Sequence, residues 1–254
     1  MPAPAASASK SATAVLHLGE VVSTNDEAFR LWRAGECGPL WVLADLQTGG
    51  RGRSGRAWVG GAGNLHASLL MTQLAPPESQ PQLSLVTGVA VVDALRGCAC
   101  EADLVGLRLK WPNDILIAGR KVGGILIETS TAAGKGAALV IGIGLNVVSH
   151  PHDLDRPVTS LGAHGVQVEC RELLAAVDAS LAAWLSRWSQ GGGFAAIRQA
   201  WCERAGPVGE RVDVDTGRGR IAAEFRGLDE DGALLVAEAG GRIVRVRAGD
   251  VDLA

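Results

Sequence analysis

The chain has 254 residues, of which 47% are hydrophobic, enough for one large domain or for a large and a small one. Its formal net charge is −3 and its pI is about 6.0. This balance argues against non-specific DNA or RNA binding, because binding to a polymeric anion needs a basic surface. No stretch of about 18 uninterrupted apolar residues is present, so no membrane-spanning helix is expected.

Residues 1–11 are small and lack both the charged start and the long apolar run of a signal peptide, so they predict a disordered tail. The five cysteines form no CxxC motif and have no histidine partners at metal-ligand spacing. Both features predict a cytoplasmic protein whose thiols are reduced.

Hydrophobic periodicity and turn residues predict a series of strands and helices up to residue 205. The first helix has capping-box spacing at Thr24 and Glu27, and Gly35 is expected to end it. In chain order, we expect strand 12–18, helix 24–33, strands 39–45 and 65–72, helix 82–98, strands 107–111, 114–130 (with a turn near Gly119) and 137–148, a turn at Gly134-Lys135-Gly136, and helices 170–188 and 193–205.

The pattern changes after Gly206-Pro207. Four short alternating segments, separated by glycine-containing turns, predict a small antiparallel barrel over 206–254 beside a larger domain over 12–205. Because strands and helices do not alternate strictly in the larger domain, the predicted fold class is α+β rather than a doubly wound sheet.

The segment QTGGRGRSGRAW (47–58) is the most informative part of the chain. Its glycines lose much entropy when ordered and its guanidinium groups cannot be buried unpaired, so residues 50–57 predict a flexible cationic loop, here called the arginine loop. Guanidinium forks match carboxylate and phosphate oxygens, which favours a loop that closes over an anionic ligand. The alternatives are a solvated basic loop or a weak nucleic-acid patch. The slightly acidic chain favours the small anion.

Two further motifs combine lysine with turn residues. LKWPND offers Lys110, Asn113 and Asp114, although Pro-Asn-Asp alone is typical of a plain turn. KVGGILIE begins an apolar strand with Lys121, and its glycine pair would let the backbone approach a ligand closely. The alternative for this second motif is a hairpin with an exposed lysine.

The remaining patterns are weaker. GIGLN (142–146) resembles half of a dinucleotide fingerprint but lacks the third glycine and a following helix, and no Walker A sequence is present. The histidines His150, His152 and His164 are more typical of a solvated loop than of a metal site.

Taken together and in order, five motifs resemble those of the biotin protein ligases. They are Ser23-Thr24-Asn25, Gln47 with GRGRSGRAW (50–58), KWPND (110–114), KVGGIL (121–126) and GIGLN (142–146). The resemblance spans about residues 12–205 and implies a mixed-sheet catalytic domain of the biotin/lipoate ligase type; the C-terminal barrel fits the family's SH3-like module. Because only a short tail precedes the first strand, the chain resembles the monofunctional type, without the helix-turn-helix domain of the repressor type.

The resemblance implies an ATP-dependent reaction in two steps. Biotin and ATP would give biotinyl-5′-AMP and pyrophosphate, and a lysine of a biotin carboxyl carrier domain would then take the biotinyl group and release AMP. The first step joins two anions, so positive charge and N–H donors must offset their repulsion. Mg²⁺ is implied through the ATP phosphates, with no metal site formed by the protein itself.

The resemblance also assigns roles to individual residues. Biotin contacts are implied for Ser23, Thr24, Asn25, Gln47, Gly50, Arg51, Gly52, Arg53, Lys121, Gly124, Gly142 and Gly144. ATP contacts are implied for Arg51, Arg53, Arg56, Trp58, Lys110, Asn113, Lys121 and Asn146. Catalysis is expected from Lys121 at the carboxylate–phosphate junction, from Arg53, which would retain the intermediate, and from Asp114, which would orient or deprotonate the incoming lysine.

One position departs from the family pattern, because Ser54 stands where a second consecutive arginine is frequent. We expect the arginine loop to be disordered without ligand and ordered with biotinyl-AMP, since ordering its glycines needs contacts that offset the entropy cost. Adenine contacts are expected from residues 147–165. A homodimer and the role of the barrel in carrier binding, ATP binding or stability are left open.

The main alternative function is a lipoate or octanoate ligase or transferase, which would act on a similar lysine carrier. The arginine loop and KWPND favour biotin. A non-catalytic sensor of biotin or nucleotide is disfavoured by the presence of Lys121 and the full loop. A nucleic-acid-binding repressor is disfavoured because the chain has neither a basic balance nor a recognisable DNA-binding domain.

Overall fold

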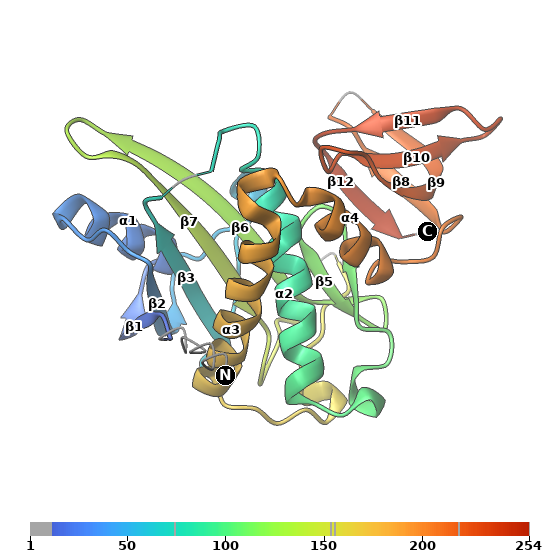
Figure 1. The fold of residues 1–254 in the computed structure, drawn as a ribbon. Helices are drawn as coiled ribbons and strands as arrows, with labels where there is room; N and C mark the ends of the chain where they lie inside the picture. Colours follow the sequence, from blue (N-terminus) through green and yellow to red (C-terminus); the bar gives the residue numbers. More distant parts are fainter. Residues whose placement is uncertain (1–11, 74, 153, 155, 218, 254) are drawn as a thin grey trace, which may run out of the picture.

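The computed structural model describes residues 12–73, 75–152, 154, 156–217 and 219–253, so the predicted tail at 1–11 lies outside the described residues. Up to residue 203 the elements are β1 (Ala14–Val21), α1 (Thr24–Ala34), β2 (Leu40–Gln47), β3 (Leu65–Met71), α2 (Gln82–Cys98), β4 (Arg108–Lys110), β5 (Asp114–Ile117), β6 (Arg120–Ala132), β7 (Gly136–Leu145), α3 (Cys170–Trp188) and α4 (Phe194–Glu203) (Figure 1). The predicted elements are all present: helices 82–98 and 170–188 match α2 and α3, the other elements have shifted ends, and the predicted strand 114–130 is divided by a turn at Ala118-Gly119.

The first seven strands form one mixed sheet in the order β1-β2-β3-β7-β6-β5-β4. β1 runs parallel to β2, and the other neighbours are antiparallel. β6 and β7 form a long hairpin, and the predicted turn at its tip has Gly134 and Gly136 at φ +73°, a region that glycine enters without a Cβ clash.

Helices cover the two faces of this sheet unequally. α2, α3 and α4 pack on one face and share a large core with inward residues such as Leu69 and Ile141 (Figure 1). On the opposite face α1 packs through Phe29 and Trp32 against Val140 and its neighbours. α1 covers the part of that face over β2, β3 and one end of β7, and the part over β6 and β5 holds the cavity described below. No helix among the described residues is long and apolar enough to cross a membrane.

The start of α1 differs from the predicted capping box. Ser23 is the N-cap, with φ −155° and ψ 132°, and its side chain accepts a hydrogen bond from the backbone N–H of Asp26. Thr24 is the first helical residue, and its backbone N–H and hydroxyl both lie within 3.0 Å of Gln47 Oε1. The prediction of Thr24 as the cap was therefore wrong, because its hydroxyl pairs with β2 instead of the helix backbone. Gly35 ends the helix as predicted, at φ +113°.

The C-terminal part is a five-stranded antiparallel sheet in the order β11-β10-β9-β8-β12. Its strands are β8 (Arg211–Asp215), β9 (Arg220–Leu228), β10 (Leu234–Glu238), β11 (Ile243–Val246) and β12 (Asp250–Leu253). The expected number of four segments was too low, because the chain turns at Gly249 (φ +153°) and β12 returns to pair with β8. A Cβ at Gly249 would lie 2.2 Å from the carbonyl oxygen of Asp215, so only glycine fits this turn.

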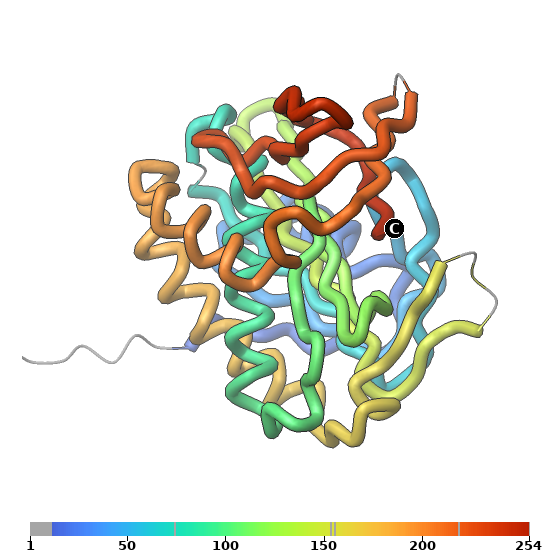
Figure 2. The backbone as a smooth tube through the Cα atoms, turned by 90° about the vertical axis from the view of Figure 1, so that its right-hand side faces the viewer, coloured from blue at the N-terminus to red at the C-terminus, as the bar shows by residue number. Residues whose placement is uncertain are grey.

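The two sheets share an interface that places β12 beside the larger domain. Trp111 Nε1 donates to the carbonyl oxygen of Gly232 at 3.1 Å, and Arg108 pairs with Glu210 at 2.7 Å. Trp201 of α4 packs against Phe225, with ring centroids 6.3 Å apart. Figure 2 shows the C-terminal segment close to the light-blue chain that holds the arginine loop. The predicted α+β fold class, a mixed sheet with helices plus a small C-terminal β domain, is thus confirmed.

Candidate active site

A cavity of about 390 Å³ opens between the start of α1, strands β5–β7, the arginine loop and β12. Among the residues that line it are Ser23, Thr24, Asn25, Gln47, Arg51, Gly52, Arg53, Arg56, Trp58, Lys110, Asn113, Asp114, Lys121, Gly124, Gly142 and Gly144. All the predicted site residues except Gly50 and Asn146 are therefore brought together around one space, although they come from segments far apart in the sequence.

One end of the cavity is a pocket of neutral polar groups. The side chains of Thr24 and Asn25 are almost fully buried, and Gln47 Oε1 accepts from both the N–H and the hydroxyl of Thr24. Ser68 Oγ lies 2.7 Å from Thr24 Oγ1 and 2.5 Å from Asn25 Oδ1. Fixed donors and acceptors of this kind suit a neutral heterocycle better than a charged group.

Glycines on β6 and β7 make room in this pocket. Gly142 and Gly144 lie two residues apart on β7, so they face the same side of the sheet. A Cβ at Gly142 would lie 2.5 Å from Asn25 Oδ1, and one at Gly144 would lie 2.5 Å from the indole ring of Trp58. The GIGLN motif therefore acts here as a strand whose missing side chains admit Asn25 and Trp58, and not as a phosphate loop.

We expect Gly144→Ala to raise the KM for a ligand of this pocket by about tenfold, because the new methyl group must displace the Trp58 ring. Steady-state kinetics with varied ligand concentration measures the change. Gly97→Ala is the matched control, since a Cβ at that position meets nothing within 4 Å. Equal KM values in the two variants would show that the Trp58 ring does not border the ligand.

Lys121 reaches the cavity because β6 contains a bulge. The register shifts between Ile115 and Leu116, so that Lys121 and Gly124 face the same side although they are three residues apart. Lys121 Nζ pairs with Asp114 Oδ1, and its side chain is 12% exposed. Lys110 Nζ pairs with the other oxygen of Asp114 at 3.1 Å and donates to the carbonyl oxygen of Val251 at 2.7 Å.

The carboxylate of Asp114 thus pairs with two ammonium groups, so the cluster of Asp114, Lys110 and Lys121 has a formal charge of +1. Burial alone would raise the pKa of Asp114, but Lys121 and Lys110 hold it below its ordinary value, so Asp114 is ionised at neutral pH. Burial lowers the pKa of Lys121, because the single carboxylate only partly offsets the loss of water around that ammonium group.

A pH dependence follows from the lowered pKa of Lys121. A reaction that needs its ammonium form should lose rate as pH rises through that pKa, which lies below the ordinary 10.5 of lysine. We expect the alkaline fall of the first chemical step below pH 10.5. Lys121→Arg should remove that fall within the accessible range, because a guanidinium group stays charged. An unchanged alkaline limb in Lys121→Arg would assign the fall to another group.

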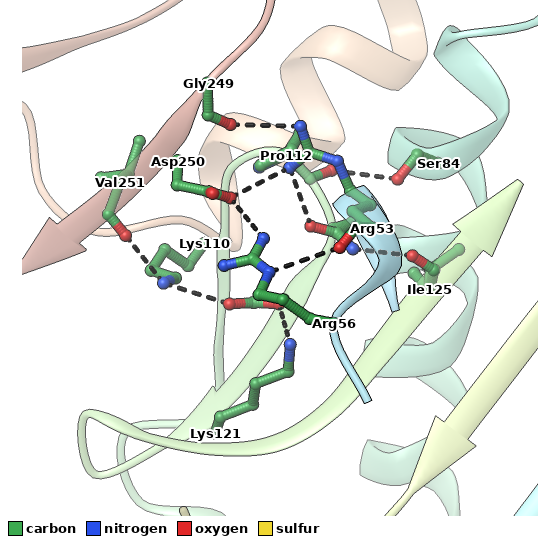
Figure 3. A network of polar contacts seen from close by, with 12 residues as sticks. Arg53, Arg56, Ser84, Lys110, Pro112, Lys121, Ile125, Gly249, Asp250 and Val251 are labelled. Carbon is green, nitrogen blue, oxygen red and sulfur yellow. Dashed lines mark hydrogen bonds and ion pairs between the residues drawn. The ribbon is translucent and has the colours of Figure 1, made fainter. Parts of the chain in front are cut away.

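The arginine loop is held at both ends by carboxylates. Arg51 forms two hydrogen bonds with Asp26 of α1, at 2.7 and 2.6 Å. At the other end Arg56 Nη2 lies 2.9 Å from Asp250 Oδ1, and Arg53 donates to the carbonyl oxygen of Gly249 at 3.2 Å (Figure 3). The cationic end of the cavity is therefore built from the loop, from Lys110 and from the last strand of the C-terminal sheet. Ser54 lies at φ 56° inside the short 3₁₀ turn Arg53–Gly55 of this loop.

Two predicted residues lie behind the cavity wall. Gly50 is buried, and its carbonyl oxygen accepts from the N–H of Trp58, which closes the base of the arginine loop. Asn146 is buried as well, and its side chain donates to the carbonyl oxygen of Thr159 at 2.9 Å. Both residues shape the segments that carry the site.

Several residues of the site were not predicted from the sequence. His66 and Ser68 of β3 lie under the pocket, and burial lowers the pKa of His66, so its ring is neutral at pH 7. The sequence did contain a pattern that could have predicted them, because His66 and Ser68 are polar residues at alternate positions of an apolar strand and therefore face the same side. Arg156 and Asp250 line the cavity from distant segments, and no local pattern could have placed them there.

The histidine-containing segment forms its own contacts. His150 Nδ1 lies 3.2 Å from Ser160 Oγ, and His164 Nε2 lies 3.0 Å from Thr159 Oγ1. Within the described residues, no group of three or more His, Cys, Asp or Glu side chains could hold a metal ion. Of the region predicted to contact adenine, Arg156 and Pro157 reach the cavity wall.

The comparisons with known proteins agree with this geometry. Residues 18–146 match the model of the biotin/lipoate A/B protein ligase family, and residues 208–254 match the biotin protein ligase C-terminal domain. A biotin–[acetyl-CoA-carboxylase] ligase of Paracoccus denitrificans is 38% identical over 233 residues, covering 89% of this chain and 95% of that protein. The bifunctional ligase/repressor BirA of Bacillus subtilis is 32% identical, covering 84% of this chain and 65% of the repressor.

Solved structures give the same result. The biotin protein ligase of Aquifex aeolicus in complex with biotin and ATP has a TM-score of 0.78 at 30% identity, covering 95% of this chain and 98% of that one. A biotin protein ligase of Leishmania major in complex with biotinyl-5-AMP has a TM-score of 0.64 at 28% identity, covering 92% and 99%. The chain belongs to the biotin protein ligase family, as the five motifs predicted.

Proposed function

We propose that the chain is a biotin–[biotin carboxyl-carrier protein] ligase, which makes biotinyl-5′-AMP and transfers biotin to a lysine of a carrier domain. The observation that carries the proposal is the position of Lys121, between a neutral polar pocket at α1 and the arginines that face β12. The names and bound ligands of the related proteins support the same reaction, since they include biotin, ATP and biotinyl-5-AMP.

In the first step, an oxygen of the biotin carboxylate attacks the α-phosphorus of ATP and the bond to pyrophosphate breaks. The neutral pocket of Thr24, Asn25 and Gln47 suits the ureido ring of biotin, and Lys121, which lines the same cavity, would contact the valerate carboxylate and the phosphate. Arg53 and Lys110 add positive charge toward β12, where the phosphates would lie (Figure 3). These charges would offset the repulsion between the two reacting anions.

Mg²⁺ would accompany ATP at the same end of the cavity. The side chain of Asn113 donates to the carbonyl oxygen of Ile125 at 2.7 Å, so its Oδ1 is turned toward Arg53 and the cavity. An amide oxygen is a suitable ligand for a hard cation that keeps most of its contacts to water and phosphate. The carboxylates of Asp114 and Asp250 already pair with lysine and arginine, which is consistent with a metal held mainly by the nucleotide.

In the second step, the ε-amine of a carrier lysine attacks the carbonyl carbon of the mixed anhydride and AMP leaves. The arginine loop would cover the adenylate until the carrier arrives, with Arg53 retaining the intermediate. The resemblance gives Asp114 the role of orienting or deprotonating the incoming amine, but its carboxylate already pairs with Lys110 and Lys121, which favours a role in holding Lys121 in place. The expected substrate is a biotin carboxyl carrier domain of a carboxylase, in line with the names of the related ligases.

The test is pyrophosphate release from Mg·ATP with biotin, lipoate or octanoate as the acid, followed by transfer to a purified carrier domain. We expect release with biotin alone, and mass addition of one biotinyl group to the carrier. Release with lipoate or octanoate in place of biotin would favour the lipoate-type reaction. Binding of biotin without any pyrophosphate release would make the chain a sensor.

A further inference from the structure

Glu128 of β6 has a carboxylate beside the polar pocket. It lies outside the five motifs, and the resemblance assigns it no role. It lies four residues beyond Gly124, on the same face of the strand. Its Oε2 accepts from Asn25 Nδ2 at 2.6 Å and lies 3.7 Å from Arg51 Nη2. One carboxylate oxygen therefore contacts both the start of α1 and the arginine loop.

The contact with Asn25 fixes how its amide is turned. A carboxylate can only accept a hydrogen bond, so the NH₂ group of Asn25 must point to Glu128 and its Oδ1 must point to Ser68. Asn25 is 4% exposed and cannot turn freely. Asn25 lines the cavity, so its amide meets the cavity in one defined orientation.

The contact with Arg51 acts on the loop. Arg51 lies between Asp26 on α1 and Glu128 on β6, and the two carboxylates together attract the loop toward the polar pocket. The pair with Asp26 is partly exposed and is worth little by itself in water. Of the two carboxylates, Glu128 is the one that also accepts a hydrogen bond from a buried side chain of the pocket, that of Asn25.

We propose that Glu128 is a positioning residue that couples the polar pocket to closure of the arginine loop. The inference rests on the proposed function, because the pocket is taken to hold the biotin ring. Through Asn25, Glu128 sets the affinity for biotin; through Arg51, it sets how long the closed loop keeps biotinyl-AMP.

Two substitutions separate these contacts. Glu128→Gln keeps an oxygen that accepts from Asn25 but removes the charge that attracts Arg51, whereas Glu128→Ala removes both. We expect Glu128→Gln to keep the biotin KM within about twofold of wild type and to shorten the half-life of bound biotinyl-AMP about fivefold. Glu128→Ala should raise the biotin KM about tenfold and shorten the half-life at least as much as Glu128→Gln, because biotinyl-AMP carries the same ring. The half-life is measured by chasing preformed, radiolabelled adenylate with unlabelled biotin and ATP.

A double-mutant cycle tests the link to the loop. Arg51→Ala should shorten the half-life, and adding Glu128→Gln to it should cause no further change, because the two residues act through one contact. Glu203→Gln, the same chemical change at an exposed position of α4, should leave both quantities at wild-type values.

Three results would overturn the proposal: equal biotin KM values in the two Glu128 variants, an unchanged half-life in Glu128→Gln, or independent effects of Glu128→Gln and Arg51→Ala. These outcomes differ from a failure of the proposed function. If wild-type protein made no biotinyl-AMP, the ligase assignment itself would fall. If wild type made and retained it while both Glu128 variants matched wild type, only the role of Glu128 would be wrong.

Discussion

Replacement of Lys121 by alanine is expected to reduce pyrophosphate release from ATP and biotin by about 10²–10³-fold, the scale on which one preorganised charge or donor acts in a transition state. The ammonium group of Lys121 is largely shielded from water, with its side chain 12% exposed. Charge in such a place stabilises developing negative charge far better than the same charge in water. The loss should appear in kcat for the first step, measured by a continuous pyrophosphate assay.

The variant should still fold, because Asp114 keeps its second partner. Lys110 Nζ remains 3.1 Å from Asp114 Oδ2, so the buried carboxylate is not left alone. Thermal unfolding of Lys121→Ala checks this point. Lys135→Ala is the matched control, since Lys135 is exposed in the turn between β6 and β7 and should retain the full rate. A rate within a few-fold of wild type in Lys121→Ala would remove Lys121 from the chemistry.

Local patterns were sufficient to predict most of the fold. The predicted turn glycines at 119, 134 and 136 adopt positive φ values, and the long apolar helix 82–98 matches α2. The capping prediction failed at Thr24, because its hydroxyl finds a partner on β2 that lies 23 residues away. The last C-terminal segment was predicted as one strand, since only pairing with β8 reveals that the chain turns back at Gly249.

In the site, likewise, the residues within the motifs could be predicted from the sequence, but the contacts that depend on tertiary packing could not. The order of the motifs predicts that Lys121, Asp114 and the arginines share one site, and the cavity does bring them together. The bulge that turns Lys121 toward the cavity could not be predicted, because it depends on the register between β5 and β6. The contacts of Asp250 depend on docking of the C-terminal sheet, and no spacing in the sequence records that docking.

Asp114→Asn is expected to lower the rate of pyrophosphate release by about 10²-fold, because the amide cannot hold two ammonium groups in place and Lys121 loses the carboxylate that keeps it charged. Removing one partner of a buried ion pair costs about 3 kcal/mol, so we also expect a fall of roughly that size in the free energy of unfolding. Urea unfolding measures the stability change, and the pyrophosphate assay measures the rate. Asp213→Asn on β8 is the control for a change of charge alone.

The two half-reactions separate the possible roles of Asp114. If Asp114 acts by positioning Lys121, Asp114→Asn should slow pyrophosphate release. The double variant with Lys121→Ala should then release pyrophosphate almost as fast as Lys121→Ala alone, since both substitutions remove the same Lys121–Asp114 contact. If Asp114 acts as the base for the carrier lysine, pyrophosphate release should persist and only transfer from preformed biotinyl-AMP should fail. The lowered pKa of Asp114 makes it a weak base at neutral pH. We therefore expect the first pattern, in which Asp114 contributes by holding Lys121 charged and in place.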